Sequence, residues 1–215
     1  MWGRDIENLV IVKMEEYSPF SPSAGAAGVL LGNGDDLDEV KPIYSYISQN
    51  LDDAANEMLL LIPLNHLESI TSTNSTPVQD TANSVIGYIT IPQDYLRLHS
   101  LQMVGWKKVI HATVNIGEPR AEEQENEWTM GHPYKPVVVL DEDKLRYYSI
   151  EKGKIHSIAI FKYIARFDRF AEYKSEVAEL IALNCAKKIY EIFGNSEAVS
   201  AMTNEMNSLI GIMKV

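Results

Sequence analysis

The sequence predicts an α+β protein: a helical body with a C-terminal αα-hairpin, and a small antiparallel β part inserted between the helices. Apolar residues recur at helical spacing near both ends of the 215-residue chain, whereas β-rich segments fill the middle. The pair Gly194-Asn195 separates the last two helical patterns and is typical of a turn between helices. Helices that surround a run of strands are typical of the α+β class.

The first region, residues 1–63, contains two strong helical patterns. One covers residues 4–17 and ends at two prolines, which forbid its continuation. An acidic segment at residues 35–39 is expected to open a short helix. The longest helix is expected over residues 42–62, because Pro42 suits a first helical position and apolar residues follow at steps of three and four.

The middle region, residues 64–166, is predicted to form short strands. An apolar pattern that slips by one residue near Ser100 indicates a β-bulge. The acidic segment Glu118–Glu127 is interpreted as a solvated loop, and Asp141–Lys144 as a hairpin turn. The expected strands cover residues 85–91, 95–104, 137–140, 145–150 and 157–165.

The third region, residues 167–215, is predicted to be the helical hairpin. Its helices are expected over residues 173–193 and 196–213, with apolar stripes that bury against each other. Cys185 lies on the first stripe and is expected to be a buried structural thiol. Because it is the only cysteine, an internal disulfide framework and a multi-thiolate zinc site are excluded.

Composition limits the function classes. The chain has 30 acidic and 19 basic residues and a net charge of −11, which disfavours a nucleic-acid-binding surface. We find no signal peptide and no apolar run of the ~20 residues that a membrane-spanning helix needs. A soluble protein made in a reducing cytoplasm is therefore expected.

Motifs that carry chemistry are missing. The sequence has no P-loop, no dinucleotide-binding fingerprint and no nucleophile elbow, and its five histidines form no metal-binding motif. Folding is expected to need no metal or organic cofactor. A small hydrolase whose site assembles from His132, His156 and distant acids remains one alternative.

The most unusual local string is the aromatic loop, which we define as Trp128–Pro136. It combines large aromatic residues, a glycine and two prolines, but no nucleophile–base pair. It is interpreted chiefly as a rigid packing loop whose prolines fix its entry and whose aromatic residues anchor it. A second alternative is a monomeric adaptor domain that binds protein partners through this loop.

Charge is distributed unevenly along the chain. Residues 1–57 contain eleven acidic and three basic residues, a net charge of −8, whereas residues 144–174 contain eight basic and three acidic residues, a net charge of +5. This polarity is compatible with a solvated surface. It also suits head-to-tail contact between copies, in which an acidic face meets a basic one.

Three features together resemble the head-to-tail connector proteins of short-tailed bacteriophages, also called adaptor or ring proteins. One is the helix at residues 43–62 with the string Asp52-Asp53-Ala54-Ala55-Asn56-Glu57. Another is Ile91-Pro92-Gln93-Asp94-Tyr95-Leu96-Arg97-Leu98. The third is Lys144-Leu145-Arg146-Tyr147-Tyr148-Ser149-Ile150, followed by a strand and a hairpin with Phe193-Gly194-Asn195-Ser196-Glu197-Ala198. The style of sequence is most similar to the ring proteins of crAss-like phages.

The resemblance implies a ring of about twelve subunits beneath the portal protein, at the head–tail junction of a virion assembled in a bacterial cytoplasm. It implies that helices surround a channel through which DNA passes without sequence-specific binding, and that the β part meets the next tail component. The expected subunit or portal interface comprises Asp35, Asp36, Asp38, Arg166, Arg169, Met206, Leu209 and Met213. The expected tail-facing loop carries Trp128, Met130, His132 and Tyr134.

An acidic channel lining is also expected, because basic linings would bind the phosphates of passing DNA. The expected contributors are the acids of residues 35–39 and of the Glu122–Glu127 segment. The alternative is that these acids face outward and serve only solubility.

Overall fold

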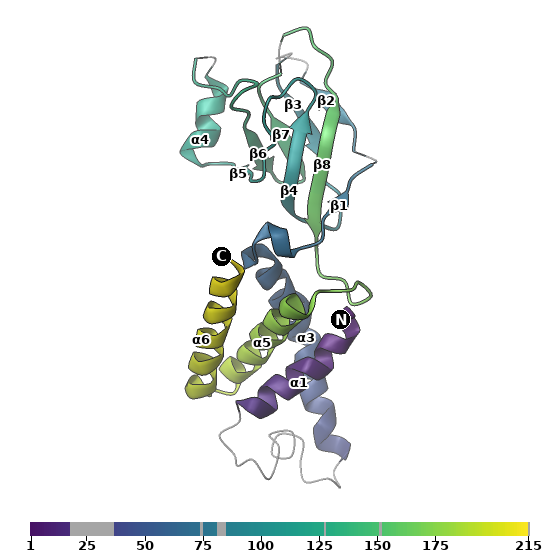
Figure 1. The fold of residues 1–215 in the computed structure, drawn as a ribbon, viewed down its shortest axis with the longest axis vertical. Helices are drawn as coiled ribbons and strands as arrows, with labels where there is room; N and C mark the ends of the chain where they lie inside the picture. The colour runs from purple at the N-terminus through teal and green to yellow at the C-terminus, as the bar shows by residue number, and fades with distance from the viewer. Residues whose placement is uncertain (18–36, 74, 81–84, 127, 151, 215) are drawn as a thin grey trace. The chain divides into compact units, whose positions relative to one another are not determined.

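The chain adopts an α+β fold of two compact units (Figure 1). The helical unit comprises Met1–Leu67 and Arg166–Val215, and the β unit comprises Glu68–Ala165. The β part expected over residues 64–166 encloses the observed β unit. The computed structural model describes residues 1–17, 37–73, 75–80, 85–126, 128–150 and 152–214.

Helix α5 is the centre of the helical unit. It packs against each of the other long helices of the described chain (Figure 1). Its residues Leu180, Ile181 and Cys185 are fully buried, as expected for a helix that is covered on most sides. The long helices are α1 (Ile6–Glu16), α3 (Leu37–Leu61), α5 (Ser175–Ile192) and α6 (Ser196–Met213), and 3-10 turns lie at Gly3–Asp5 and Leu64–His66.

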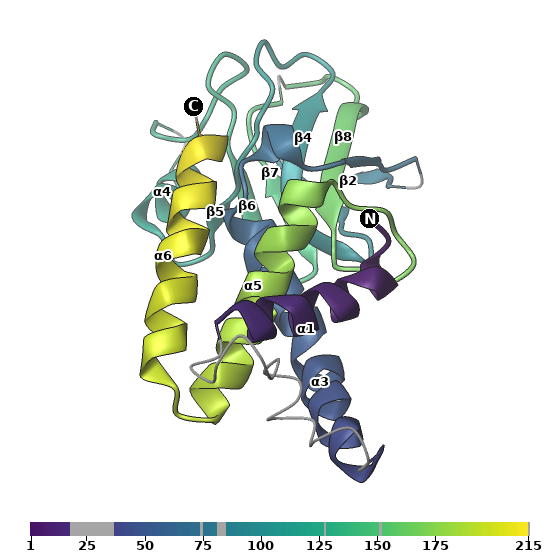
Figure 2. The same ribbon diagram turned by 60° about the horizontal axis from the view of Figure 1, so that its bottom comes forward.

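The C-terminal αα-hairpin is confirmed. Gly194 has a φ of 73°, a left-handed conformation that glycine adopts without strain. The side chain of Asn195 then caps α6 by accepting a hydrogen bond from the Ala198 amide, 3.1 Å away. Helix α6 runs beside α5 (Figure 2) and buries Met202 completely.

The short helix expected to open at residues 35–39 and the long helix expected over residues 42–62 form a single helix. Helix α3 begins at Leu37, so Pro42 lies inside its second turn and not at the first position. Proline there removes one backbone hydrogen bond. The helix continues because Ile43, Ile47 and Leu51 bury its apolar stripe, and this burial outweighs the local loss.

The β unit contains two sheets. Strands β1, β8 and β4 form an antiparallel sheet in that order, and a five-stranded sheet has the order β2-β3-β7-β6-β5. Register shifts in the β4–β8 pairing between Leu98 and Ser100 confirm the expected bulge. The strands are β1 (Ile70–Thr71), β2 (Pro77–Gln79), β3 (Gly87–Thr90), β4 (Tyr95–Met103), β5 (Val114–Asn115), β6 (Val138–Asp141), β7 (Lys144–Tyr147) and β8 (Ile158–Ala165).

The five-stranded sheet is buried on both faces at β6. Val138 points into the main core, which also holds Leu101, Tyr147 and Phe161 from strands of both sheets. Val139 belongs to a second cluster on the other face, to which the short helix α4 (Pro119–Glu122) contributes a buried alanine. Successive side chains of a strand point to opposite faces, so β6 supports both cores.

The structure corrects three expectations for the middle region. Strands β1, β2 and β5 were not expected, and β5 pairs with β6 in parallel, so the five-stranded sheet is mixed. The Glu118–Glu127 segment contains α4 and a 3-10 turn at Glu123–Glu125 in place of a loop. These elements have two to four residues each, too few to show a periodicity. Strand β7 ends at Tyr147, before the expected Ile150.

Lys13 joins three helices of the helical unit. Its side chain is almost fully buried, and Nζ lies 3.0 Å from carboxylate oxygens of Glu16 and Glu179 and 3.5 Å from one of Glu205. Burial alone would lower the pKa of Lys13, but these three carboxylates raise it well above its ordinary value. The ammonium therefore holds α1, α5 and α6 together.

We expect Lys13→Met to destabilise the helical unit by about 2 kcal/mol, because it leaves three carboxylates to repel one another around an apolar group. The raised pKa means that the contribution of Lys13 is complete below about pH 10.5 and is lost as pH rises through the higher folded-state value. The difference from the wild type should therefore narrow in alkali. Urea unfolding at neutral and alkaline pH measures it, with the exposed Arg4→Met as control. If Lys13→Met lowered the free energy of unfolding equally at neutral and alkaline pH, the charged Lys13 ammonium would not be the source of this stability.

Candidate protein interface

The methionines expected at an interface are buried within the helical unit. Met206 and Met213 are 7% and 8% exposed, and Leu209 is half-buried. Helix α6 packs its apolar stripe on α5 of the same chain, and a role of these three residues at a subunit or portal interface stays a prediction. Arg166 is exposed. Asp35 and Asp36 lie outside the described residues, and Asp38 lies in α3 with its side chain undescribed.

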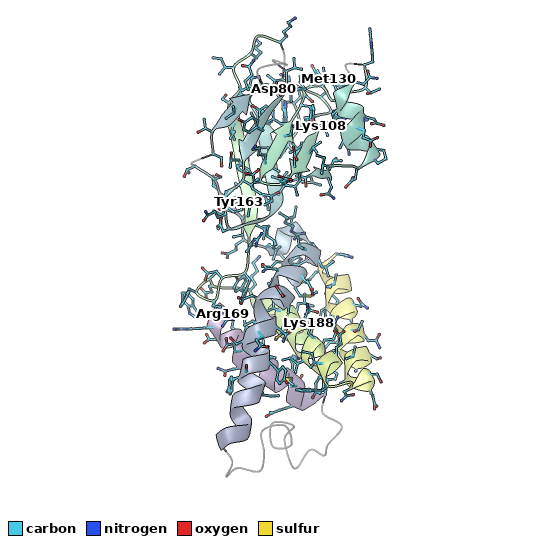
Figure 3. All side chains as sticks on the ribbon, turned by 180° about the vertical axis from the view of Figure 1, so that it is seen from behind. Asp80, Lys108, Met130, Tyr163, Arg169 and Lys188 are labelled. Carbon is cyan, nitrogen blue, oxygen red and sulfur yellow. The ribbon has the colours of Figure 1, made fainter. Side chains whose placement is uncertain are left out.

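Arg169 is used within the chain. Its guanidinium donates to Glu7 Oε1 at 3.1 Å, to Asp52 Oδ1 at 3.2 Å and to the Ser48 carbonyl at 3.0 Å (Figure 3). Acidic residues of the 1–57 segment and a basic residue of the 144–174 segment thus meet within one subunit. These bonds use the donors of the guanidinium within the chain, and a contact of Arg169 with another subunit stays a prediction.

The aromatic loop displays its aromatic residues to solvent. Trp128 is 92% exposed and Tyr134 is 64% exposed, and His132 is exposed beside Tyr134 with ring centroids 6.2 Å apart. The expectation that aromatic side chains anchor this loop is therefore wrong. Met130 is half-buried, on the same side of the β unit as α4 (Figure 3).

Polar side chains hold this loop in place. Gln124 is 2% exposed, and its Oε1 accepts a hydrogen bond from the Gly131 amide at 2.7 Å. The Thr129 hydroxyl donates to the Glu123 carbonyl at 2.6 Å. The anchors are therefore amides and a hydroxyl, which leaves the aromatic rings free to contact another molecule.

A pocket of about 630 Å³ lies next to the aromatic loop. Val104 and Ile155, 52% and 84% exposed, line it together with Lys107 and Lys154. The Lys107 amide donates to the Pro133 carbonyl at 2.8 Å, which ties the pocket wall to the loop. We define the interface surface as Val104, Lys107, Trp128, Tyr134, Lys154 and Ile155.

Sequence reasoning missed the pocket half of this surface. Its walls come from two turns, each with a glycine at positive φ: Gly105 at 98° and Gly153 at 79°. Glycine at a turn is a signal for sharp chain reversal. It does not show that two reversals distant in sequence lie side by side.

His132 and His156, which the hydrolase alternative requires in one site, have different neighbours. Nδ1 of His156 lies 2.7 Å from the hydroxyl of Tyr147, a buried residue whose pKa is raised by burial. The His132 ring lies tilted at 55° to the ring of Tyr134. Across the described ranges, no group of three or more His, Cys, Asp or Glu residues is placed to hold a metal. Burial raises the pKa of Cys185 to about 12, which fits the expected structural thiol.

Neither a scan against protein-family models nor a search of the curated proteins finds a match for this chain. Of the helices that the structure describes, none has both the length and the apolar character required to cross a membrane.

Proposed function

We propose that this chain is a structural virion protein that forms a ring between the portal and the tail of a bacteriophage. In this role the ring is a conduit for DNA during genome retention and ejection. Its partners are further copies of itself, the portal protein and the next tail ring or tube protein. DNA passes through the channel without sequence-specific binding.

The observation that carries this proposal is the rigidly held, solvent-exposed aromatic loop. Exposed Trp and Tyr side chains that are already fixed in position lose little entropy on association, and such residues dominate binding energy at protein interfaces. Trp128 and Tyr134 are exposed in this way, on a loop whose backbone is held by Gln124 and Thr129. The resemblance in three strings of sequence supports a connector as the kind of assembly.

The same observation favours a monomeric adaptor domain as a second candidate. Both proposals use the interface surface to bind protein, and they differ in whether the chain associates with itself. Measuring the mass of the species in solution therefore distinguishes a ring from a monomeric adaptor.

We expect a species of about twelve copies by mass photometry, either for the chain alone or after mixing with its portal protein. Trp128→Ser should reduce this species while leaving the melting temperature unchanged, because the side chain is 92% exposed. Phe170→Ser, which removes an aromatic side chain 77% exposed on the helical unit, is the matched control. A chain that remains monomeric at high concentration with the portal present would refute the ring and leave the adaptor.

A further inference from the structure

The outer face of the three-stranded sheet carries a polar row that crosses all of its strands. Phe161 and Tyr163 of β8 belong to the main core, so Lys162 between them points to the other face. Thr71 of β1 lies directly opposite Lys162 on one side, and Ser100 of β4 lies opposite it on the other. Residues opposite each other in a sheet share a face, so the side chains of Thr71 and Ser100 flank Lys162.

Two histidines continue this row at β4 and beside its edge. The Nδ1 atom of His99 lies 3.2 Å from the Ser100 hydroxyl. The Nδ1 atom of His111 lies 2.8 Å from the His99 carbonyl oxygen, which can only accept, so His111 carries a proton on Nδ1. The two rings meet edge to face with their centroids 6.4 Å apart. In both rings Nδ1 is used within the chain, so Nε2 is the atom that can bind another group.

The row gathers basic groups without a neutralising acid. The pKa of His99 is lowered by its burial and then by the charges of His111, Lys162 and Arg97. These three neighbours are all basic, and among the described residues no carboxylate forms a salt bridge with either histidine or with Lys162. Repulsion among the basic groups decreases when an anion binds between them, because an opposite charge stabilises each protonated form.

The row is accessible to a ligand except at Ser100. Thr71 and His111 are exposed, and Lys162 and His99 are half-buried. Ser100 is 5% exposed, so its part is to hold the His99 ring. Direct contacts therefore come from one hydroxyl, one ammonium and two imidazoles, which all donate hydrogen bonds once the imidazoles are protonated. This set of donors matches phosphate oxygens, which accept hydrogen bonds and carry negative charge.

The length of the row requires more than one phosphate. Neighbouring strands are about 4.8 Å apart, so Thr71 on β1 and His99 on β4 are separated by two such spacings, or roughly 10 Å. A single phosphate group cannot contact both ends of the row, whereas successive phosphates of a nucleic-acid strand can follow it. Contacts to phosphates carry no sequence information, which suits DNA that passes without sequence-specific binding.

We propose that the outer face of the three-stranded sheet binds the phosphate backbone of DNA through Thr71, Lys162, His99 and His111. The contact is weak near neutral pH, where histidine is mostly uncharged, and it strengthens as the two imidazoles gain protons. A weak contact near neutral pH leaves DNA free to move along the protein. This inference rests on the proposed function for the choice of DNA as the source of the phosphates.

The test uses the full chain and a fluorescently labelled DNA duplex at low salt, with binding followed by anisotropy. Affinity should be about ten-fold higher at about pH 5.5 than at about pH 7.5. Lys162→Gln should weaken binding about five-fold and reduce the slope of log affinity against log salt by about 1, because it removes one phosphate contact. Its side chain lies on the sheet surface, so the melting temperature should stay unchanged.

The histidines give a second arm. His99→Gln combined with His111→Gln should abolish the dependence of binding on pH, because no imidazole is left in the row. The matched control is His132→Gln combined with Lys152→Gln, which removes an exposed imidazole and an exposed ammonium outside the row. This control should bind DNA like the wild type at both pH values.

The outcomes separate this inference from the ring. A wild-type chain that does not bind the duplex at about pH 5.5, or variants of the row that bind it as well as the wild type, would overturn the inference and leave the ring intact. A chain that stays monomeric with the portal would refute the ring, and DNA binding that depends on Lys162 would still retain the phosphate site.

Inorganic phosphate distinguishes a single phosphate from a nucleic-acid backbone. Added at the same phosphate concentration as the duplex, it should not displace the duplex, because it contacts only part of the row. Displacement would show that the row takes single phosphates and would overturn the assignment to DNA.

Discussion

Replacing Gly87 by alanine is expected to destabilise the β unit by about 3 kcal/mol or more. Gly87 lies in β3 opposite Tyr147 of β7. A Cβ at this position would overlap the Tyr147 hydroxyl and lie 2.5 Å from its Cζ and 2.6 Å from the Val78 carbonyl oxygen. Tyr147 is fully buried in the main core and cannot move aside without disturbing it.

Urea unfolding measures this loss, because the fluorescence of the buried Trp106 reports on the β unit. Gly211→Ala is the matched control. A Cβ on Gly211, in helix α6, meets nothing within 4 Å, so alanine should stabilise that helix by about 0.5–1 kcal/mol. A Gly87→Ala protein as stable as the wild type would show that the Tyr147 ring does not cover β3 in this way.

Leu180→Asp should cost the helical unit about 4 kcal/mol or more. The side chain is fully buried on α5, the helix that contacts α1, α3 and α6. Aspartate there loses the apolar burial and places an unpaired carboxylate in the core. We expect the variant to lose the cooperative unfolding transition of the helical unit in circular dichroism.

Ile192→Asp tests whether burial is the cause. It makes a comparable change on the same helix at a position that is 54% exposed, and it should cost less than about 1 kcal/mol. If the two variants were equally stable, α5 would not be the centre of this unit. If both unfolded the protein, the exposed face of α5 would be covered by another molecule.

Periodicity over long segments determined the helical unit. The apolar stripes of the two C-terminal helices, with Gly194 and Asn195 between them, predicted the αα-hairpin and its turn. These signals are local, because a helix repeats its apolar face every three to four residues and its ends carry their own capping residues. The bulge near Ser100 was predicted for the same reason, from a slipped alternation within one strand.

The short elements of the β unit depended on tertiary contacts. Strands β1, β2 and β5 have two or three residues each and are formed by pairing with neighbours distant in sequence. The mixed order of the five-stranded sheet follows from the same pairing. No alternation can be recognised in so few residues, so the sequence does not specify them by itself.

The candidate interface likewise combines features that the sequence predicted with features that only the tertiary structure revealed. The sequence by itself singled out the aromatic loop, because its composition is unusual, but composition predicted packing where Trp128 is exposed. The buried Gln124 decided this, since its hydrogen bond to Gly131 holds the loop without using the rings. Only the tertiary structure brought Ser149 and two lysines from separate turns to the lining of one pocket. A shared pocket wall is a consequence of how distant segments meet, and local propensity does not encode it.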